Sequence, residues 1–149
     1  MRSVLIIGAG RSASSLIRYL LSKSETENLH LIVADLSLAL AEKKTNNHPN
    51  ATPIALDILD ENQRKTAIQN ATIVISMLPA HLHIEVAKDC ILYKKHLVTA
   101  SYISDAMQAM AKDVEDAGLI FMNEMGLDPG IDHMSAMKVI DEIKKENND

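Results

Sequence analysis

Short apolar runs alternate along the whole chain with stretches in which apolar residues recur every three or four positions. The runs predict six β-strands, at residues 3–7, 29–34, 53–56, 72–78, 96–99 and 119–122. The other stretches predict six helices, at residues 11–22, 38–44, 61–69, 81–94, 105–117 and 131–145. Because the run at 72–78 is nearly all apolar, we expect a central strand there, buried on both faces of a sheet.

This strict alternation predicts an α/β fold: a doubly wound, six-stranded parallel sheet of strand order 3-2-1-4-5-6 with helices on both faces. Parallel neighbours need helical crossovers, and those crossovers are right-handed. A chain of 149 residues fits a single domain, 1–149. In such sheets ligands bind outside the carboxyl ends of the strands, at the switch between the first and fourth strands.

A glycine-rich turn, GAGRSA, joins the first predicted strand to the first predicted helix. Gly8 permits the tight turn, Gly10 leaves room for a pyrophosphate, and Ala13 lets the helix pack closely. The helix start, which includes Ser12, offers N–H groups and a positive dipole end to phosphates. Arg11 either adds charge to a pyrophosphate contact or is simply solvated. Together these features predict a Rossmann-type dinucleotide site.

Asp35 ends the second predicted strand, where a carboxylate can accept hydrogen bonds from the adenosine ribose hydroxyls. A carboxylate there repels the 2′-phosphate of NADP, and it is followed by Leu36 and Ser37 rather than by an arginine. We therefore expect NAD to be preferred and NADP to be the alternative. Lys43 and Lys44 are the residues that favour NADP.

The run NEMGLDPGIDH, residues 123–133, has the composition of a binding loop and follows the sixth predicted strand. Its glycines let the backbone approach a ligand, and its aspartates can receive hydrogen-bond donors. Asp128 is either a substrate group or a cap of the last helix, whereas Asp132 belongs to the first turn of that helix. This position predicts that the loop faces the nicotinamide end of the crevice.

Other predicted strand ends face the same crevice. Asp57 lies where such folds place a group near the adenine, or it caps the next helix together with Asp60. Tyr102 either touches the substrate or packs over the sheet edge. Leu78 and Pro79 follow the fourth strand on the nicotinamide side, and Ser101 follows the fifth.

Charge and hydropathy make two kinds of binding partner unfavourable. The net charge is −5 and no basic cluster is present, so nucleic acids and anionic membrane surfaces are poor partners. No segment approaches membrane-spanning length.

Aromatic residues make up only 3% of the chain, so the core must be aliphatic and partly methionine. Four methionines at helical spacing are predicted to fill it: Met107, Met110, Met134 and Met137.

The cysteine and histidine residues argue against both a disulfide framework and a zinc site. The single cysteine, Cys90, allows no disulfide framework and is typical of a reducing, cytoplasmic location. His81, His83 and His133, taken with Cys90, match no zinc signature. We therefore expect no metal site.

Four segments carry a resemblance to a known family: VLIIGAGRSA at the start, SMLPAHLH after the fourth strand, VTASYIS after the fifth and NEMGLDPGIDHMSAMKVID near the end. Over essentially its whole length the chain resembles the N-terminal NAD(P)-binding domain of glutamate-forming saccharopine dehydrogenases (saccharopine reductases). The resemblance implies oxidative cleavage of saccharopine with NAD(P) and water in lysine metabolism, or the reverse condensation. The products would be glutamate and 2-aminoadipate 6-semialdehyde.

The resemblance also implies roles for individual residues. The implied cofactor contacts are Gly10, Arg11, Ser12, Ala13, Asp35, Leu36, Ser37, Asp57, Ile58, Leu78 and Pro79, with the backbone of Leu127 to Gly130 near the nicotinamide. The implied substrate contacts are Ser101, Tyr102 and Asp128. The reaction needs a general base that takes the amine proton and activates water, and Asp128 and Tyr102 are the titratable candidates at the right strand ends.

The chain departs from the family in two ways. Fungal relatives that use NADP carry Arg where this chain has Asp35. Members of the family also continue into a second domain, which supplies most of the substrate pocket. We therefore expect a substrate-binding domain beyond the C-terminus, and we expect the 149-residue chain alone to bind cofactor without turnover.

Two other functions stay open at this point. One is the cofactor domain of a carboxynorspermidine-type dehydrogenase, and the other is a non-enzymatic NAD-sensing domain of the kind that gates potassium transporters. A pure nucleotide sensor does not need the loop at 123–133. Met137, Ile140 and Ile143 form an apolar strip on the last predicted helix, which would dock the second domain or a partner subunit, as in a homodimer.

Overall fold

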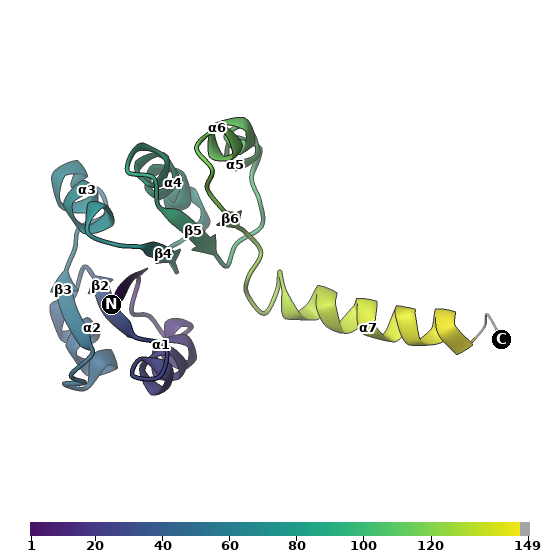
Figure 1. Ribbon diagram of the computed structural model, residues 1–149, viewed down its shortest axis with the longest axis horizontal. Helices are drawn as coiled ribbons and strands as arrows, with labels where there is room; N and C mark the ends of the chain where they lie inside the picture. Colours follow the sequence, from purple (N-terminus) through teal and green to yellow (C-terminus); the bar gives the residue numbers. More distant parts are fainter. Residues whose placement is uncertain (147–149) are drawn as a thin grey trace.

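The computed structural model, which describes residues 1–146, contains one six-stranded parallel sheet of order β3-β2-β1-β4-β5-β6 (Figure 1). This confirms the predicted fold class and strand order. The strands are β1 Arg2–Ile7, β2 Leu29–Asp35, β3 Ala51–Ala55, β4 Ile73–Ser76, β5 His96–Thr99 and β6 Phe121–Met122. The sheet order changes direction between β1 and β4, so the carboxyl ends of these two strands mark the switch point.

Helices cover both faces of the sheet, as predicted. They are α1 Ala13–Lys23, α2 Leu38–Thr45, α3 Glu61–Gln69, the 3₁₀ turn η1 Ala80–Leu82, α4 His83–Leu92, α5 Asp105–Gln108, α6 Ala111–Asp116 and α7 Ile131–Glu146. In Figure 1, α1 and α2 lie on one side of the sheet, and α3 to α6 lie on the other.

Two apolar clusters form the core, one on each face. Side chains alternate between the faces of a strand, so Val4 and Ile6 of β1 join the cluster under α1 and α2. Leu5 and Ile7, the residues between and after them, join the cluster under α3, α4 and α5. Ala9 and Ala13 of the glycine turn belong to the cluster under α1 and α2, so the turn packs against that face of the sheet.

Strand β4, predicted at 72–78, is limited to Ile73–Ser76, and three further predicted elements differ clearly from those observed. The helix predicted at 105–117 is interrupted at Ala109 and Met110, and the residues on either side form α5 and α6. The helix predicted from residue 81 begins with the 3₁₀ turn η1, which follows Pro79. Strand β6 is limited to Phe121–Met122, because β5 pairs with it only at Leu97 and Val98.

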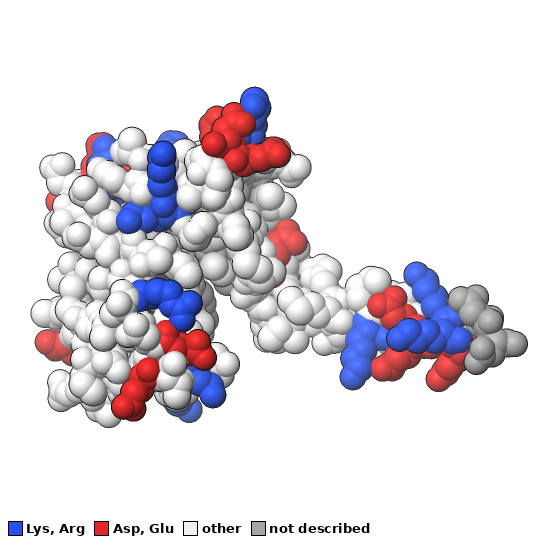
Figure 2. All heavy atoms as spheres, viewed as in Figure 1, with Lys and Arg blue, Asp and Glu red and all other residues white. Residues whose placement is uncertain are grey.

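Helix α7 extends away from the rest of the molecule (Figure 1), and none of its residues is buried. The prediction that Met134 and Met137 fill the core is therefore wrong for this chain, whereas Met107 is buried in α5. Figure 2 shows charged side chains of both signs gathered on the far half of α7, while the half near the sheet carries few. Among the described residues, no helix is long and apolar enough to cross a bilayer.

Candidate cofactor and substrate site

The glycine turn has the geometry that a dinucleotide requires. Gly8 has φ +105°, which side chains rarely adopt, and a Cβ there would lie 3.1 Å from the carbonyl oxygen of Met77. Gly10 is different, since a Cβ there would meet no protein atom within 4 Å. The backbone therefore needs a glycine at position 8, while the space beside Gly10 is left for a ligand.

Asp35 binds the glycine turn directly. Its Oδ2 accepts a hydrogen bond from the Ala9 N–H at 2.8 Å, and its Oδ1 accepts one from the Ser37 N–H at 2.9 Å. The carboxylate thus joins the end of β2 to the turn after β1 and to the start of α2. Each oxygen keeps a further lone pair, so ribose hydroxyls can still donate to it.

Helix α1 begins where the turn ends. Ala13 is fully buried, which lets the helix start close to the sheet, and the Ser12 side chain makes no capping hydrogen bond. Arg11 is exposed. The N-terminus of this helix of 11 residues therefore lies directly after the glycine turn, where unpaired N–H groups of a helix can bind phosphate.

A slot of about 290 Å³ lies beside Gly8, between the ends of β1, β2, β3 and β4. Six predicted cofactor residues line it: Gly8, Asp35, Leu36, Asp57, Ile58 and Leu78. The slot is mostly apolar, which suits an adenine ring with its ribose at Asp35. The sequence argument placed these residues together, and the structure brings them to one cavity.

The wall of this slot is held by a buried ion pair that sequence reasoning missed. Arg64 of α3 is 6% exposed, and its Nε lies 2.6 Å from Asp89 Oδ2 of α4. Its Nη1 donates to the carbonyl of Ile58 at 2.7 Å. Sequence spacing gave no signal for this pair, because the two residues lie on different helices.

Asp57 and Asp60 have separate local roles. Asp57 Oδ1 accepts from the Leu59 N–H at 2.9 Å, which closes a turn at the rim of the slot. Asp60 alone caps α3, accepting from the N–H groups of Asn62 and Gln63. The Gln63 hydrogen bonds lower the pKa of Asp60, so this carboxylate is charged at neutral pH.

The other half of the crevice is built from the loops after β5 and β6, which hydrogen bond to each other. The Glu124 N–H donates to the Ser101 carbonyl at 3.1 Å, and the Ile103 N–H donates to Glu124 Oε1 at 3.1 Å. Thr99 Oγ1 donates to Asn123 Oδ1 at 3.0 Å. The run at 123–133 is thus an ordered loop fixed to the end of β5.

Two glycines make this loop possible. A Cβ on Gly126 would lie 2.9 Å from the Ala100 carbonyl oxygen. Gly130 has φ +144°, and a Cβ there would clash with the carbonyl oxygen of Gly126 and lie 2.7 Å from that of Glu124. Gly126 and Gly130 also form a bridge across the loop. These glycines close the loop on itself, so their first role is structural.

Tyr102 and Asp128 meet between these two loops. The Tyr102 hydroxyl donates to Asp128 Oδ1 at 2.7 Å, and Tyr102 is 60% exposed. The hydrogen bond to Asp128, with some desolvation and the nearby carboxylates, raises the pKa of the phenol above its usual value of 10. Tyr102 is therefore protonated at neutral pH and donates to Asp128, and both groups face solvent.

Asp132 belongs to the start of α7, as predicted. Its Oδ1 accepts from the Gly130 N–H at 2.8 Å and lies 2.9 Å from His133 Nδ1. Desolvation would raise the pKa of Asp132, but the hydrogen bonds from His133 and Gly130 lower it on balance. The two aspartates of the loop therefore have different partners: Asp132 binds the start of α7, and Asp128 binds the Tyr102 hydroxyl.

His83 is a buried polar residue that sequence reasoning passed over. Its Nδ1 lies 2.9 Å from Ser76 Oγ at the end of β4, and its Nε2 lies 2.9 Å from Ser101 Oγ. Burial, with a smaller contribution from His81, lowers the pKa of the ring below 6.5. The SMLPAHLH segment was noted in the sequence, but nothing in its spacing predicted a contact with Ser101.

Two further predicted cofactor residues, Pro79 and Leu127, do not line the slot. Pro79 precedes η1, and Leu127 is 74% exposed in the loop after β6. Lys44 donates to Ser14 Oγ on α1, so one of the two lysines that would favour NADP is already engaged. No group of three or more histidine, cysteine or acidic residues within 1–146 is arranged to hold a metal ion.

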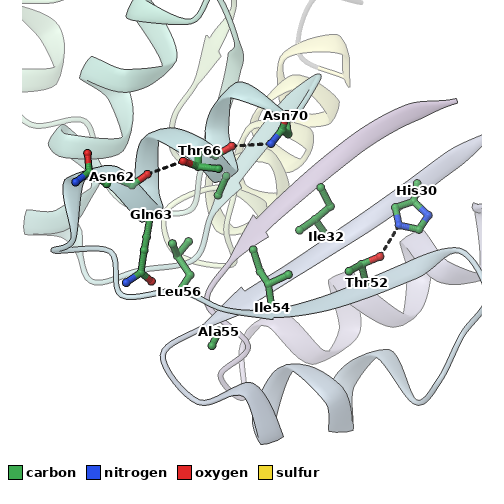
Figure 3. A pocket seen from close by; sticks show the side chains of 11 residues that line it. His30, Ile32, Thr52, Ile54, Ala55, Leu56, Asn62, Gln63, Thr66 and Asn70 are labelled. Carbon is green, nitrogen blue, oxygen red and sulfur yellow. Dashed lines mark hydrogen bonds between the residues drawn. The ribbon is translucent and has the colours of Figure 1, made fainter.

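A larger cavity of about 550 Å³ lies away from these residues, between β2, β3 and α3. Figure 3 shows its apolar floor, Ile32, Ile54 and Leu56, with polar side chains at its rim, such as His30 hydrogen bonded to Thr52. None of the predicted cofactor or substrate residues lines it. The crevice at the strand ends is therefore the better candidate site.

Comparison with known proteins identifies the family. Residues 4–122 match the family model described as saccharopine dehydrogenase NADP binding domain. The chain belongs to the saccharopine dehydrogenase family. This membership favours the saccharopine dehydrogenase interpretation over a carboxynorspermidine-type dehydrogenase domain or an NAD sensor.

Individual relatives agree with this assignment. The chain is 38% identical to an NADP(+)-dependent, L-glutamate-forming saccharopine dehydrogenase of Schizosaccharomyces pombe, with 97% of this chain and 32% of that protein covered. It is 38% identical to an alpha-aminoadipic semialdehyde synthase of Arabidopsis thaliana, with 95% of this chain and 15% of that protein covered. The chain therefore spans about a third or less of the length of these relatives.

Among solved structures, the apo L-Glu-forming saccharopine dehydrogenase of Saccharomyces cerevisiae superposes with a TM-score of 0.85 at 35% identity, with 97% of this chain and 32% of that chain covered. Sequence and fold therefore agree that the chain is a saccharopine dehydrogenase domain of the kind described as NADP binding.

Proposed function

We propose that the chain is the cofactor-binding domain, 1–149, of an NAD(P)-dependent saccharopine dehydrogenase. The proposed reaction converts saccharopine, NAD(P) and water into glutamate and 2-aminoadipate 6-semialdehyde, and it is reversible. The observation that carries the proposal is the Tyr102–Asp128 hydrogen bond of 2.7 Å, formed between two loops at the strand ends of a domain of this family.

The pair suits the chemistry of the reaction. Oxidation transfers a hydride from carbon to the nicotinamide and removes a proton from the secondary amine, which leaves an imine. Water then adds to the imine carbon, the carbon–nitrogen bond breaks, and the departing amine takes a proton. A carboxylate at Asp128 can accept the amine or water proton, and the Tyr102 hydroxyl holds that carboxylate in place.

The role of Asp128 is tested by Asp128→Ala in protein that carries its substrate domain. We expect cofactor affinity to change less than about 2-fold, whereas kcat falls about 100-fold or more, as for loss of a general base. Stopped-flow measurement of NAD(P)H formation and fluorescence titration of the cofactor give the two values.

The exposed Asp113 of α6 offers a matched control, because its side chain makes no hydrogen bond within residues 1–146 and Asp113→Ala should leave both values unchanged. If Asp128→Ala weakens cofactor binding and turnover equally, the loop is only structural, and the catalytic assignment fails.

We further propose that this domain prefers NAD, although the S. pombe relative is an NADP(+) enzyme. Asp35 supports the proposal, since backbone N–H groups hold its carboxylate beside the glycine turn, and a 2′-phosphate on a ribose bound there would lie beside a like charge. Leu36 and Ser37, the next residues, offer that phosphate no cationic side chain.

Cofactor preference can be measured on the chain itself. We expect the Kd of NADP to exceed that of NAD by about 10-fold or more, and Asp35→Asn to reduce this ratio by removing the charge. Glu42→Gln, an exposed acidic position on α2, should leave the ratio unchanged. A lower Kd for NADP than for NAD in the unmodified chain would overturn the preference.

We propose that α7 docks the substrate-binding domain that follows in the longer protein. The match to the S. pombe relative covers 97% of this chain, yet that relative is about three times longer. Met134, Met137, Val139 and Ile140 are all exposed on α7, so a second domain has an apolar surface to cover. The isolated chain should therefore bind cofactor without turnover.

Docking through α7 is tested by Met137→Asp in protein with the second domain. We expect loss of turnover with cofactor affinity retained, and Glu142→Lys, on the side of α7 away from Met137 and Ile140, serves as the control. We also propose that the protein forms a homodimer, and sedimentation analysis would distinguish a homodimer from docking of the second domain.

We propose a cytoplasmic location as well, because the single cysteine, Cys90, is buried and unpaired with another cysteine, as is typical of a reducing compartment.

A further inference from the structure

His83 joins two strand ends through buried hydrogen bonds that neither cofactor binding nor the Tyr102–Asp128 pair explains. The ring is 3% exposed and Ser76 is fully buried, while Ser101 lies partly exposed at the crevice. Both ring nitrogens lie 2.9 Å from a serine hydroxyl, Nδ1 from Ser76 and Nε2 from Ser101. The chain of contacts thus runs from the sheet interior to a residue on the substrate side.

The surroundings of Ser76 decide which ring nitrogen carries the proton. A neutral imidazole has one donor and one acceptor nitrogen. Among the described residues, the ring is the only hydrogen-bond partner of Ser76 Oγ, so the buried Ser76 O–H has no other acceptor than Nδ1. A buried donor left unpaired is strongly unfavourable. Nδ1 therefore accepts, and the proton is on Nε2.

This tautomer determines what Ser101 can offer a ligand. The Nε2–H donates to Ser101 Oγ, so one lone pair of that oxygen is occupied. The Ser101 O–H is not needed by the ring, and no other side-chain hydrogen bond of Ser101 is present within 1–146. Its hydroxyl hydrogen is therefore free to donate into the crevice, beside Tyr102 and the loop after β6.

We propose that His83 is a positioning residue, whose Nε2–H holds Ser101 so that the Ser101 hydroxyl donates to a carboxylate of the amino-acid substrate. The carboxylate rests on the proposed function, whereas the Ser76–His83–Ser101 hydrogen bonds do not. A fixed donor orients the carboxylate before the reaction, so it acts on substrate binding more than on proton transfer.

The tautomer is tested on the chain itself by ¹⁵N NMR of its histidine rings at pH 7.5. We expect His83 to show a protonated Nε2 and an unprotonated Nδ1, and Ser76→Ala to abolish this preference because the donor to Nδ1 is gone. His81→Gln, two residues away, removes the signals of the neighbouring ring and so helps to assign the spectrum, and it should leave the His83 tautomer unchanged. A protonated Nδ1 in the unmodified chain would overturn the proposal.

The carboxylate contact is tested by kinetics in protein with the substrate domain. We expect Ser101→Ala to raise the KM for saccharopine about 10- to 100-fold, as for loss of a hydrogen bond to a charged group, with little change in the KM of the cofactor. His83→Leu should raise the same KM, and His83→Gln, which keeps an N–H donor, should restore part of it.

The outcomes separate the inference from the function on which it rests. A purely structural role for His83 would lower thermal stability and the active fraction without a selective rise in the KM for saccharopine, and this result overturns the proposal. Protein with the predicted tautomer but no saccharopine oxidation would instead overturn the proposed function. In that case the carboxylate donor falls with it, while the hydrogen-bonded tautomer stands.

Discussion

The two ends of the crevice, where we propose that the adenine and the nicotinamide bind, are built in different ways. At the adenine end, the glycine turn and Asp35 lie close to each other because adjacent parallel strands end together, and the Asp35 carboxylate binds backbone N–H groups that lie next to those strand ends. At the nicotinamide end, the loops after β5 and β6 are held by side chains and by two glycines that fit against carbonyl oxygens. A site that depends on local backbone conformation can be recognised in the sequence as a short motif. A site that depends on contacts between side chains of different loops can be recognised only in the folded chain.

The comparison predicts the largest loss of stability from a change in the nicotinamide-end loop. Gly130→Ala should destabilise the chain by about 2–4 kcal/mol, because the new Cβ meets three backbone atoms at a positive φ. Gly118→Ala is the matched control: its φ is also positive, +67°, but its surroundings are open, so about 1 kcal/mol is expected. Urea unfolding measures both, and equal losses would show that the loop is less tightly closed than the structure indicates.

The adenine end can be tested by separating folding from binding. Gly10→Ala should leave the unfolding midpoint unchanged, because no protein atom lies within 4 Å, yet weaken cofactor binding about 10-fold or more. Gly8→Ala should lower stability as well, by about 1–3 kcal/mol, because of its φ of +105° and the nearby Met77 carbonyl. Should Gly10→Ala bind NAD(P) normally, the pyrophosphate does not approach this turn.

The smallest expected effect concerns pH and the residue that links β4 to the nicotinamide end. Burial lowers the pKa of His83 in the folded state, so the unfolded chain takes up this proton first as pH falls below 6.5. Stability should therefore be full above pH 6.5 and decline between that value and the lower folded pKa. His83→Gln should remove this part of the decline in thermal melts, and His30→Gln, at the start of β2, should not.

Much of the site was predictable because it depends on local sequence. Gly8, Gly10 and Asp35 could be assigned from their positions after predicted strands, since parallel strands bring such positions to one edge of a sheet. The run at 123–133 could be recognised as a loop of special geometry from its two glycines. The Asp132 contact with its own helix start was also predictable, because its partners are neighbours in the chain.

Other features could not be predicted because their partners are far apart in the chain. The Arg64–Asp89 ion pair joins two helices, and the Ser76–His83–Ser101 contacts join β4, α4 and the loop after β5. Helical spacing also misplaced Met134 and Met137 in the core, since periodicity shows an apolar face but not what covers it.

The sequence by itself determined the strand order, the dinucleotide turn and the family, because periodicity and short motifs record local backbone requirements. Only the tertiary structure decided that Tyr102 donates to Asp128, that Ser101 is held by His83 and that α7 extends into solvent. The physical reason is that hydrogen bonds and packing between distant segments depend on how crossovers bring them together. One sequence read along its length does not contain those distances.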